Sequence, residues 1–568
     1  MMLEELIAGL DVRVVSGKAG LVRVCDLTED SRTVVPGSLF IARSGTKADG
    51  KQYLEWALEA GAVAVLTDDV GLKCPTGSSV PVVFSADVPK ASGDMAERFY
   101  GQPASKLKLI GVTGTNGKTT TTYLIWQLLN SAGTRCGLIG TVLVDDGAEV
   151  APASMTTPPS IEISRTLAMM VEGGCQAATL EVSSHALDQK RADALPFAAA
   201  VFTNLSGDHL DYHKTMDNYA AAKVRLFDRL SPAGVAIVNA QDPWSERMIQ
   251  GVKGPVLRCG VGVGAGPAKG DCTAHILEES IHGMLLKLSG PWGTVQATVP
   301  LIGRYNAMNM LQAAAACHAV GMTEADLARG LPRVSAPPGR LERVSEPGDA
   351  ISVFVDYAHS DDSLKSVLMS VGAVMESRRH ATGDVHDAAG AVVERPQGGR
   401  LWVVFGCGGE RDRTKRPRMG LVAATHADQV VVTNDNPRIE KPGDIVDEIL
   451  AGVPVEHKGK IAVQIDRERA IRVAIESALP GDVIVIAGKG HETEQVLPDG
   501  AGGTIRTHFD DREVARTILA ERRSQVVDKP RGEPKLRRGT GAPNARPGGH
   551  GLGNTGIRGT KRSHKHGR

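Results

Sequence analysis

Short apolar runs that alternate with helix-length segments constrain the fold of this chain most strongly. Each run holds five or six residues rich in Val, Ile and Ala, and a polar or glycine-rich segment follows it. Such runs are typical of strands that are buried on both faces of a parallel sheet covered by helices. The predicted strands are 107–112, 177–182, 198–203, 235–239, 352–356, 401–405, 429–433 and 482–487. We therefore predict an α/β fold built on mostly parallel sheets.

The length and composition indicate a multidomain globular protein. A chain of 568 residues exceeds the size at which one hydrophobic core stops growing, about 250–300 residues. Apolar residues make up 42% and charged residues 23%, without an apolar run long enough for a membrane span and without a secretory signal. The eight cysteines form no Cys-x-x-Cys pair, which argues against a zinc ribbon and a disulfide framework. We expect a cytoplasmic protein.

The net charge of zero conceals two oppositely charged parts. Residues 523–568 contain 12 Lys and Arg against 2 Asp and Glu, so the remaining chain carries a charge of −10. This basic tail is rich in Gly, Pro and His and poor in apolar residues, and we predict that it is disordered. A second weakly apolar stretch, at about 376–399, is predicted to be a surface insertion.

The segments that follow the predicted strands are the candidates for a functional site. Ligands of open α/β sheets bind at the carboxyl ends of the strands. These segments are 113–119, 181–185, 204–213, 357–359, 406–413, 434–438 and 488–492. They contain most of the polar, glycine-rich and histidine-rich sequences of the chain, so we expect them to form the site.

The segment from Gly111 to Thr119 is predicted to be a phosphate-binding loop. It follows a strand, ends in Gly-Lys-Thr and opens a helix, so its backbone N–H groups and the helix end can hold phosphate oxygens. Lys118 would reach the β- and γ-phosphates, and Thr119 would reach Mg²⁺. Val112 occupies the place of the usual first glycine, so we expect a variant in which Gly111 and Gly114 replace it.

Polar residues after the next two strands suggest a metal site. Glu181 beside Thr119 could complete a phosphate-bound Mg²⁺, because Mg²⁺ prefers oxygen ligands. His185 and His209 follow strands of the same predicted sheet, although a single histidine is more often a surface residue. The spacing of Lys223 alone indicates only a solvated lysine or a second phosphate contact.

The chain resembles the Mur ligases of peptidoglycan synthesis over about residues 25–515. Most similar are the members that add the third amino acid to UDP-MurNAc-L-Ala-D-Glu. The shared motifs are Gly-Thr-Asn-Gly-Lys-Thr at 114–119, Thr-Thr-Pro at 156–158, Glu-Val-Ser-Ser-His at 181–185, Thr-Asn-Leu-Ser-Gly-Asp-His-Leu-Asp-Tyr-His at 203–213, Gly-Arg-Tyr-Asn at 303–306, Gly-Arg-Leu-Glu at 339–342, Asp-Tyr-Ala-His at 356–359, Asp-Asn-Pro-Arg at 435–438 and Gly-Lys-Gly-His-Glu at 488–492.

The resemblance implies three domains: a smaller N-terminal α/β domain that binds the UDP substrate, a central P-loop-type ATPase domain and a C-terminal Rossmann-like domain that binds the incoming amino acid. We place them at 1–105, 106–336 and 337–522, before the tail at 523–568. The implied ATP contacts are Gly114, Thr115, Asn116, Gly117, Lys118, Thr119, Thr120, Asn306, Arg340 and Asp356. The implied UDP-substrate contacts are Ser31, Thr156, Thr157, Ser183, Gln189 and Arg191.

The resemblance also implies the chemistry. ATP would be a co-substrate and Mg²⁺ the cofactor, with Thr119, Glu181, His209 and a carbamylated Lys223 (N6-carboxylysine) as metal ligands. The catalytic residues would be Lys118, Glu181, His209 and Lys223. The D-Glu γ-carboxylate would react through an acyl phosphate and release ADP and phosphate. No nucleic acid would be obligatory and no membrane span is expected, although the basic tail could bind anionic lipid or nucleic acid, and we expect a monomer.

The segment 434–438 bears on which amine is added. Meso-diaminopimelate carries a second carboxylate that lysine lacks, and an arginine such as Arg438 can bind it with two hydrogen bonds. A plain loop arginine paired with Glu440 is the alternative. The implied diaminopimelate contacts are Arg411, Asp435, Asn436, Pro437, Arg438, Gly488 and Glu492. A lysine-adding ligase, a folylpolyglutamate-type ligase and a P-loop NTPase without ligase activity remain alternatives.

Overall fold

A computed structural model describes residues 1–45, 49–75, 79–207, 209–262, 268–380, 385–386, 392–393 and 399–527. Residues Met1–Arg522 form one compact unit. Most of the predicted disordered tail and much of the predicted insertion lie outside the described residues. Within that insertion the structure has a helix that continues to His380 and a two-stranded pairing of 385–386 with 392–393. No helix of the described part is long and apolar enough to cross a membrane.

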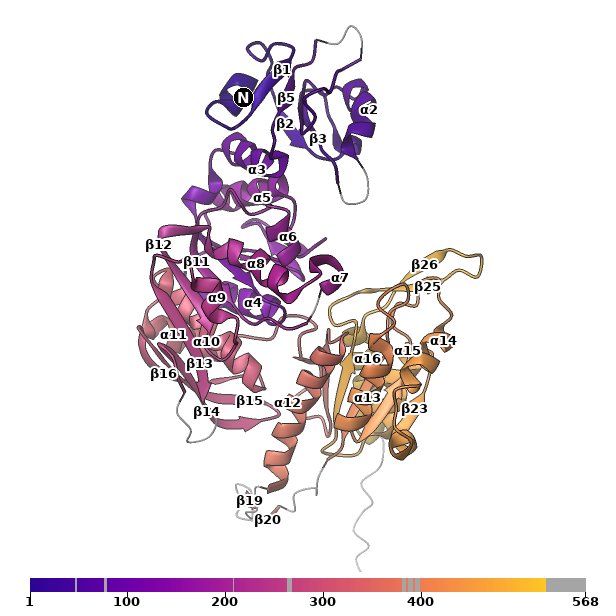
Figure 1. The fold of residues 1–568 in the computed structure, drawn as a ribbon. Coiled ribbons are helices and arrows are strands. Elements are labelled where there is room, and N and C mark those ends of the chain that lie inside the picture. The colour runs from indigo at the N-terminus through magenta and orange to yellow at the C-terminus, as the bar shows by residue number, and fades with distance from the viewer. Residues whose placement is uncertain are drawn as a thin grey trace, which may run out of the picture. The chain divides into compact units, whose positions relative to one another are not determined.

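The N-terminal segment forms a five-stranded sheet in the order β1-β5-β4-β3-β2, parallel except for β1 (Figure 1). Leu39 and Ile41 belong to one apolar cluster with residues of α1 and α3, and Phe40 belongs to a second cluster with residues of α2, so helices cover both faces of this sheet. The elements are α1 (Leu3–Ile7), β1 (Arg13–Ser16), β2 (Asp26–Thr28), β3 (Ser38–Ala42), α2 (Leu54–Glu59), β4 (Ala64–Thr67), β5 (Val82–Phe84) and α3 (Val88–Phe99).

The central segment forms an eleven-stranded sheet in the order β16-β15-β14-β13-β12-β11-β6-β10-β7-β8-β9. Its middle, from β14 to β7, is parallel, and both edges are antiparallel. The strands are β6 (Lys108–Thr113), β7 (Cys136–Ile139), β8 (Leu143–Asp145), β9 (Val150–Pro152), β10 (Ala177–Glu181), β11 (Phe197–Phe202), β12 (Leu230–Asn239), β13 (Val256–Gly262), β14 (Cys272–Ser280), β15 (Gly283–Gly290) and β16 (Gly293–Val299).

Helices cover both faces of this sheet. Ile110 and Val112 of β6 pack with α4 and α10, whereas Leu109 packs in the apolar cluster on the opposite face. This two-sided burial explains the continuous apolar runs of the sequence. The helices are α4 (Lys118–Ser131), α5 (Ser160–Glu172), α6 (Ser184–Asp188), α7 (Leu210–His213), α8 (Met216–Phe227), α9 (Ser245–Ile249), α10 (Arg304–Ala319) and α11 (Glu324–Gly330).

The third segment forms a six-stranded sheet in the order β17-β18-β24-β21-β22-β23, parallel except for β17. Helices α12 to α14 pack on one face, and α15 and α16 on the other. The elements are β17 (Glu342–Arg343), β18 (Ser352–Asp356), α12 (Asp361–His380), β19 (Val385–His386), β20 (Val392–Val393), β21 (Leu401–Phe405), α13 (Lys415–His426), β22 (Gln429–Val432), α14 (Pro442–Leu450), β23 (Ile461–Val463), α15 (Arg467–Ser477), β24 (Val483–Ala487), β25 (Glu494–Pro498), β26 (Thr504–His508) and α16 (Asp511–Val527).

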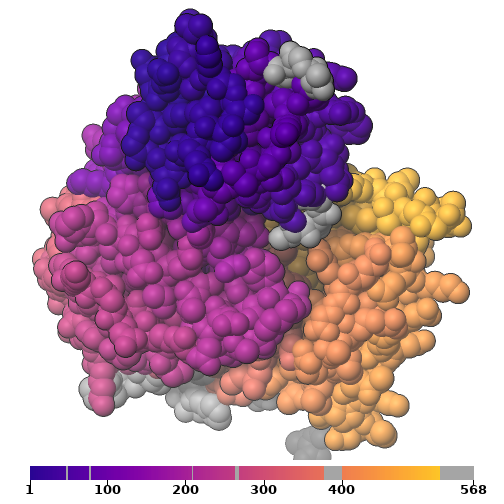
Figure 2. All heavy atoms as spheres, turned by 45° about the horizontal axis from the view of Figure 1, so that its top comes forward, coloured from indigo at the N-terminus to yellow at the C-terminus, as the bar shows by residue number. Residues whose placement is uncertain are grey.

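The three sheets confirm the predicted three-domain α/β architecture. All eight predicted strands are present, as β6, β10, β11, β12, β18, β21, β22 and β24. Figure 2 shows the atoms of the same chain, with the first segment in indigo, the central segment from purple to pink and the third segment in orange to yellow. Within the described residues, five short 3₁₀ helices connect elements: Ser31–Thr33, Gly50–Tyr53, Pro103–Lys106, Leu331–Arg333 and Val455–Lys460. The exact domain boundaries stay predictions.

Candidate active site

The predicted phosphate loop joins β6 to α4, and the helix begins at Lys118. Gly114 and Gly117 have φ values of 153° and 82°, and a Cβ on Gly114 would lie 1.9 Å from Thr203 Oγ1. A side chain therefore fits neither backbone conformation well. The loop is shorter than the sequence suggested, because Gly111 lies inside β6. A Cβ there would lie 2.7 Å from Leu226 Cδ1, so this glycine allows close packing and does not replace the missing loop glycine.

Glu181, the last residue of β10, lies beside Thr119 in the first turn of α4, as predicted. The Thr119 hydroxyl donates to Glu181 Oε2 at 3.0 Å, and the Thr141 backbone N–H and hydroxyl donate to the same carboxylate at 2.7 and 2.9 Å. Glu181 is only 1% exposed. The sequence reading missed Thr141, which follows the unpredicted strand β7. A carboxylate and a hydroxyl are thus held side by side where a phosphate-bound cation would need oxygen ligands.

Lys223 reaches the phosphate loop from α8. Its Nζ donates to the Gly114 carbonyl at 2.8 Å and lies 4.4 Å from the centre of the Tyr219 ring, and the residue is 1% exposed. The His209 ring lies 6.2 Å from the same Tyr219 ring and 4.9 Å from the His185 ring. Lys223 is therefore a buried residue of the site, which its spacing in the sequence could not show.

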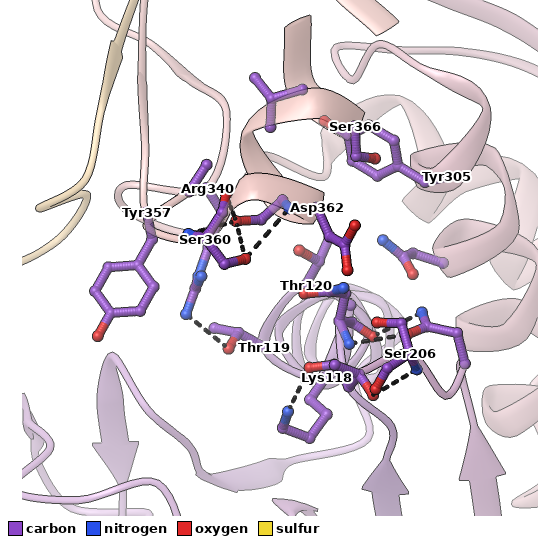
Figure 3. Close-up of a pocket in the computed structure, with 18 of the residues that line it drawn as sticks. Lys118, Thr119, Thr120, Ser206, Tyr305, Arg340, Tyr357, Ser360, Asp362 and Ser366 are labelled. Carbon is purple, nitrogen blue, oxygen red and sulfur yellow. Dashed lines mark hydrogen bonds between the residues drawn. The ribbon is translucent and has the colours of Figure 1, made fainter. Parts of the chain in front are cut away.

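A cavity of about 620 Å³ extends from the phosphate loop (Figure 3). Of the ten predicted ATP residues, all except Gly114 line it. In Figure 3 Arg340 reaches towards Thr119, and its Nη2 lies 3.5 Å from the threonine hydroxyl. Tyr305, Asn309, Ser363 and Ser366 also line the cavity, although sequence reasoning did not assign them. Ser360, Ser363 and Ser366 follow the predicted strand 352–356 in the sequence, and this repetition of serines could have indicated that the segment lines a polar site.

Asp356, at the end of β18, organises the wall opposite the phosphate loop. Its carboxylate accepts the backbone N–H groups of Leu341 at 2.6 Å and Ala358 at 2.8 Å. Burial raises the pKa of this carboxyl, while the Arg340 guanidinium opposes the shift. Arg340 itself lies 4.3 Å above the centre of the Tyr357 ring. Both predicted residues are thus held by fixed contacts.

A second cavity, of about 800 Å³, gathers the predicted diaminopimelate residues. Arg411, Asp435, Asn436, Arg438, Gly488 and Glu492 all line it. Pro437 does not line it and instead lies against Gly409, where a Cβ would be 1.9 Å from the proline carbonyl oxygen. Lys415 and Arg418 add cationic lining that was missed, although they directly follow the predicted segment 406–413. His209 lines both this cavity and the nucleotide cavity, so the two adjoin there.

Arg438 adopts a left-handed backbone with φ of 55°, an uncommon conformation for a residue with a side chain. Its Nη1 donates to the Gly409 carbonyl at 2.5 Å. Glu440, its alternative partner, instead accepts from both Nη atoms of the buried Arg416 at 2.9 Å. This ion pair lowers the pKa of Glu440 to about 2. The guanidinium of Arg438 therefore belongs to the cavity wall.

Two acceptor groups of the same cavity share a buried cation. The Lys489 Nζ lies 3.3 Å from Asn436 Oδ1 and 3.2 Å from Glu492 Oε2, and its side chain has no exposed surface. Asn436 Nδ2 also donates to Glu492 Oε2 at 2.9 Å. These contacts orient both predicted residues before any ligand arrives.

The predicted UDP-substrate residues fall into separate groups. Gln189 and Arg191 line a cavity of about 430 Å³, and Ser31 lines another of about 440 Å³. Arg191 donates to the Thr157 carbonyl at 2.6 Å, and Thr157 donates to Ser183 Oγ at 3.3 Å. Thr156 lines the nucleotide cavity instead. Glu29 and Arg43, which sequence reasoning missed, line both smaller cavities and form an ion pair at 2.8 Å.

The fold and these cavities define a nucleotide-binding α/β enzyme with a polar cavity beside its phosphate loop. Three family models match the chain: "Mur ligase family, catalytic domain" at residues 26–100, "Mur ligase middle domain" at 112–317 and "Mur ligase, glutamate ligase domain" at 379–490. The chain belongs to the Mur ligase family.

Similar curated proteins cover almost the whole chain. A UDP-N-acetylmuramoyl-L-alanyl-D-glutamate–2,6-diaminopimelate ligase of Gloeobacter violaceus is 42% identical over 527 residues, 92% of this chain and 99% of that protein. The protein of the same name from Synechococcus elongatus is 41% identical over 529 residues, 92% of this chain and 100% of its own length.

Solved structures agree with this grouping. A structure with the same enzyme name has a TM-score of 0.63 at 30% identity and covers 92% of this chain and 99% of its own. A MurF ligase from Thermotoga maritima, solved in complex with ADP, has a TM-score of 0.55 at 16% identity, covering 88% of this chain and 99% of its own. The second likeness supports the fold alone.

Proposed function

We propose that this chain is an ATP-dependent ligase that joins meso-diaminopimelate to the D-Glu γ-carboxylate of UDP-MurNAc-L-Ala-D-Glu in peptidoglycan synthesis. The observation that carries the proposal is the meeting of two cavities at His209. One cavity contains the phosphate loop and the other contains Arg438 and Glu492. A carboxylate activated by ATP in the first cavity would lie next to an amine held in the second. The names of the two curated relatives support the same reaction.

The reaction proceeds in two steps, with the protein binding and orienting the reactants. A γ-carboxylate oxygen attacks the ATP γ-phosphorus, ADP leaves, and an acyl phosphate forms. The diaminopimelate amine then attacks the acyl carbonyl, phosphate leaves, and the proton of the amine passes to solvent. Lys118 and the N–H groups at the start of α4 neutralise the negative charge that gathers when carboxylate meets polyphosphate. Because positioning and charge supply the catalysis, no nucleophilic side chain is required.

The residues at the phosphate loop fit a phosphate-bound Mg²⁺. Glu181 and the Thr119 hydroxyl are adjacent oxygen groups that could bind the ion, and among the described residues no group of three His, Cys, Asp or Glu side chains could hold a metal alone. Oxygens of ATP would therefore complete the coordination, and Mg²⁺ would supply Lewis-acid charge stabilisation there. We also propose His209 and a carbamylated Lys223 as ligands of a second ion, because a carbamate would turn this buried cation into an oxygen donor.

The choice of diaminopimelate rests on the cationic side chains of the second cavity, which acidic side chains line as well. Arg411, Lys415, Arg418 and Arg438 line it together. The second carboxylate of diaminopimelate would pair with a guanidinium there, whereas lysine would leave that cation without a substrate partner. This favours diaminopimelate over lysine, and the predicted uridine contacts disfavour a folylpolyglutamate-type ligase. We further propose a cytoplasmic monomer that acts only on small molecules and thereby supports cell-wall growth, cell shape and division.

A phosphate-release assay tests the ligase against an NTPase without a coupled bond-forming step. We expect phosphate to appear at a substantial rate only when ATP, the UDP-dipeptide and diaminopimelate are all present. Omitting either the UDP-dipeptide or diaminopimelate should reduce the rate to background. The acyl phosphate cannot form without the carboxylate of the UDP-dipeptide, and it does not turn over without the amine of diaminopimelate. Phosphate release that is equally fast with ATP alone would contradict the proposed function.

A further inference from the structure

A buried ion pair lies behind the second cavity and outside its lining. Arg467 is the first residue of α15, and its Nε and Nη2 donate to the two carboxylate oxygens of Asp511, each at 2.7 Å. Asp511 is the first residue of α16, and neither side chain has exposed surface. Burying such a pair is costly unless its remaining hydrogen-bonding groups are satisfied. Its other contacts therefore indicate what it does.

The remaining contacts of this guanidinium go to two backbone carbonyls. Nη1 donates to the Asn434 carbonyl at 2.9 Å, and Nη2 donates to the Ala487 carbonyl at 3.0 Å. These carbonyls immediately precede Asp435 and Gly488, where two loops of the cavity wall begin. A Cβ on Gly488 would lie 3.0 Å from the Asp435 carboxylate and 3.7 Å from Arg467 Nη2. One side chain thus holds the starting points of both loops.

The sheet itself does not link these two loops directly. They follow β22 and β24, and β21 lies between these strands. Ladder hydrogen bonds therefore fix each loop only through the intervening strand. A planar guanidinium has several donors in a fixed arrangement and can join a carboxylate and two carbonyls at once, whereas a lysine ammonium acts as a flexible point charge. The arginine is suited to set the separation of the loops.

We propose that Arg467, held in place by Asp511, is a positioning residue for the amine substrate. It fixes Asp435 and Asn436 relative to Gly488 and Glu492 and so determines how tightly the amine binds. Because Asp511 begins α16, this last helix supports the amine site, although none of its described residues lines the cavity. The inference rests on the proposed function, since it takes the second cavity as the binding site for diaminopimelate.

The test removes both charges together. In the double variant Arg467→Met with Asp511→Leu, apolar side chains of similar volume replace the pair, a change that buried ion pairs often tolerate. We expect a thermal midpoint close to that of the wild type, a KM for diaminopimelate at least about tenfold higher, and a KM for ATP within about twofold, because displaced loops misplace only the amine. An unchanged KM for diaminopimelate in the folded double variant would overturn the inference.

The chain offers a matched control between the same two helices. Arg472 of α15 pairs with Glu521 of α16 at 2.5 Å, but their side chains are 33% and 46% exposed. The control variant Arg472→Gln with Glu521→Gln should leave both KM values unchanged, since an exposed pair contributes little and lies away from the loops. An equal rise in the control would show a general effect of loosening the helices and would also overturn the inference.

Two further measurements keep the test decisive. If the double variant does not fold, Arg467→Lys is tested instead. Lysine retains the positive charge but lacks the fixed planar arrangement of donors, and we expect the same selective rise in the KM for diaminopimelate. If the wild-type protein does not use diaminopimelate, the proposed function fails, and amide hydrogen exchange still decides the inference. Residues 434–438 and 488–492 should exchange faster in the double variant than in the control, and equal exchange would refute the positioning role.

Discussion

Glu181 shows how single residues prepare this site. Three donors from Thr119 and Thr141 hold its carboxylate in one orientation, although it is almost fully buried. A buried carboxylate is costly unless it is hydrogen-bonded, and these donors offset that cost. A cation that approaches with the nucleotide would therefore meet a ligand that needs no reorganisation.

Glu181→Gln tests the proposed metal role. The amide keeps the size and one acceptor of the carboxylate but removes its charge, so we expect kcat to fall by about a hundredfold or more. The concentration of Mg²⁺ needed for half-maximal activity should also rise. Phosphate release measured across a range of MgCl₂ concentrations checks both effects. A variant with wild-type Mg²⁺ dependence would remove Glu181 from the proposed ligands.

Arg438→Ala tests the proposed carboxylate contact. Loss of one partner of a buried charge pair costs about 2–5 kcal/mol, so we expect the KM for diaminopimelate to rise by roughly thirtyfold or more. The KM for ATP should stay the same. Arg413→Ala is the control, because Arg413 pairs with Glu448 and its side chain is 63% exposed. If the KM for diaminopimelate did not change in Arg438→Ala, the assignment of the cavity would be wrong.

At the level of elements, long apolar runs of the second and third sheets were predictable, whereas the buried strands β3, β4 and β7 were missed. Val483 and Val485 of β24 face one core and Ile484 and Ile486 the other, so the whole strand reads as one apolar run. In β16 (Gly293–Val299) exposed and buried residues alternate, so no such run exists. The short strand β7 contains Cys and Gly, and missing it also hid Thr141. Lys223 could not be placed because its role depends on how α8 packs against the loop.

His491 gives the loop after β24 a pH dependence. Burial lowers the pKa of this histidine to about 4, with the nearby Arg340 and Arg512 adding to the shift. The unfolded chain, with a histidine pKa of about 6.5, therefore binds a proton more readily than the folded protein. This group thus imposes no penalty above about pH 6.5, and its contribution reduces the stability as the pH falls from there to about 4. Denaturant titrations at several pH values between about 6.5 and about 4 would give the free energy of unfolding of each protein. The variant His491→Gln should lose less of this free energy than the wild type as the pH falls, and an equal loss in both proteins would contradict the expectation.

At the scale of the whole molecule, charge separates the chain into two parts. Residues 1–522 carry a net charge of −10, and the 46 residues after them carry +10. All the described residues of the proposed site belong to the compact unit Met1–Arg522. Helix α16 extends to Val527, and its first residue anchors Arg467. The end of this helix is therefore the natural limit of the catalytic part.

Truncation after Val527 tests this limit. We expect the shortened protein to retain wild-type kcat and KM values and an unchanged thermal midpoint, because the proposed site is complete without the basic segment. Truncation after Asp510 is the contrasting variant: it removes α16 and Asp511 and should abolish ligase activity. A large loss of activity in the first variant would show that the basic tail contributes to catalysis.

The identity of the ligated amine tests the central claim most directly. The purified protein would be supplied with ATP, UDP-MurNAc-L-Ala-D-Glu and equal concentrations of meso-diaminopimelate and L-lysine, and mass spectrometry would identify the products. We predict that the diaminopimelate product predominates by at least about a hundredfold, since only this amine offers a second carboxylate to the arginine side chains of the cavity. Predominant formation of the lysine product, or of no tripeptide product, would contradict the account.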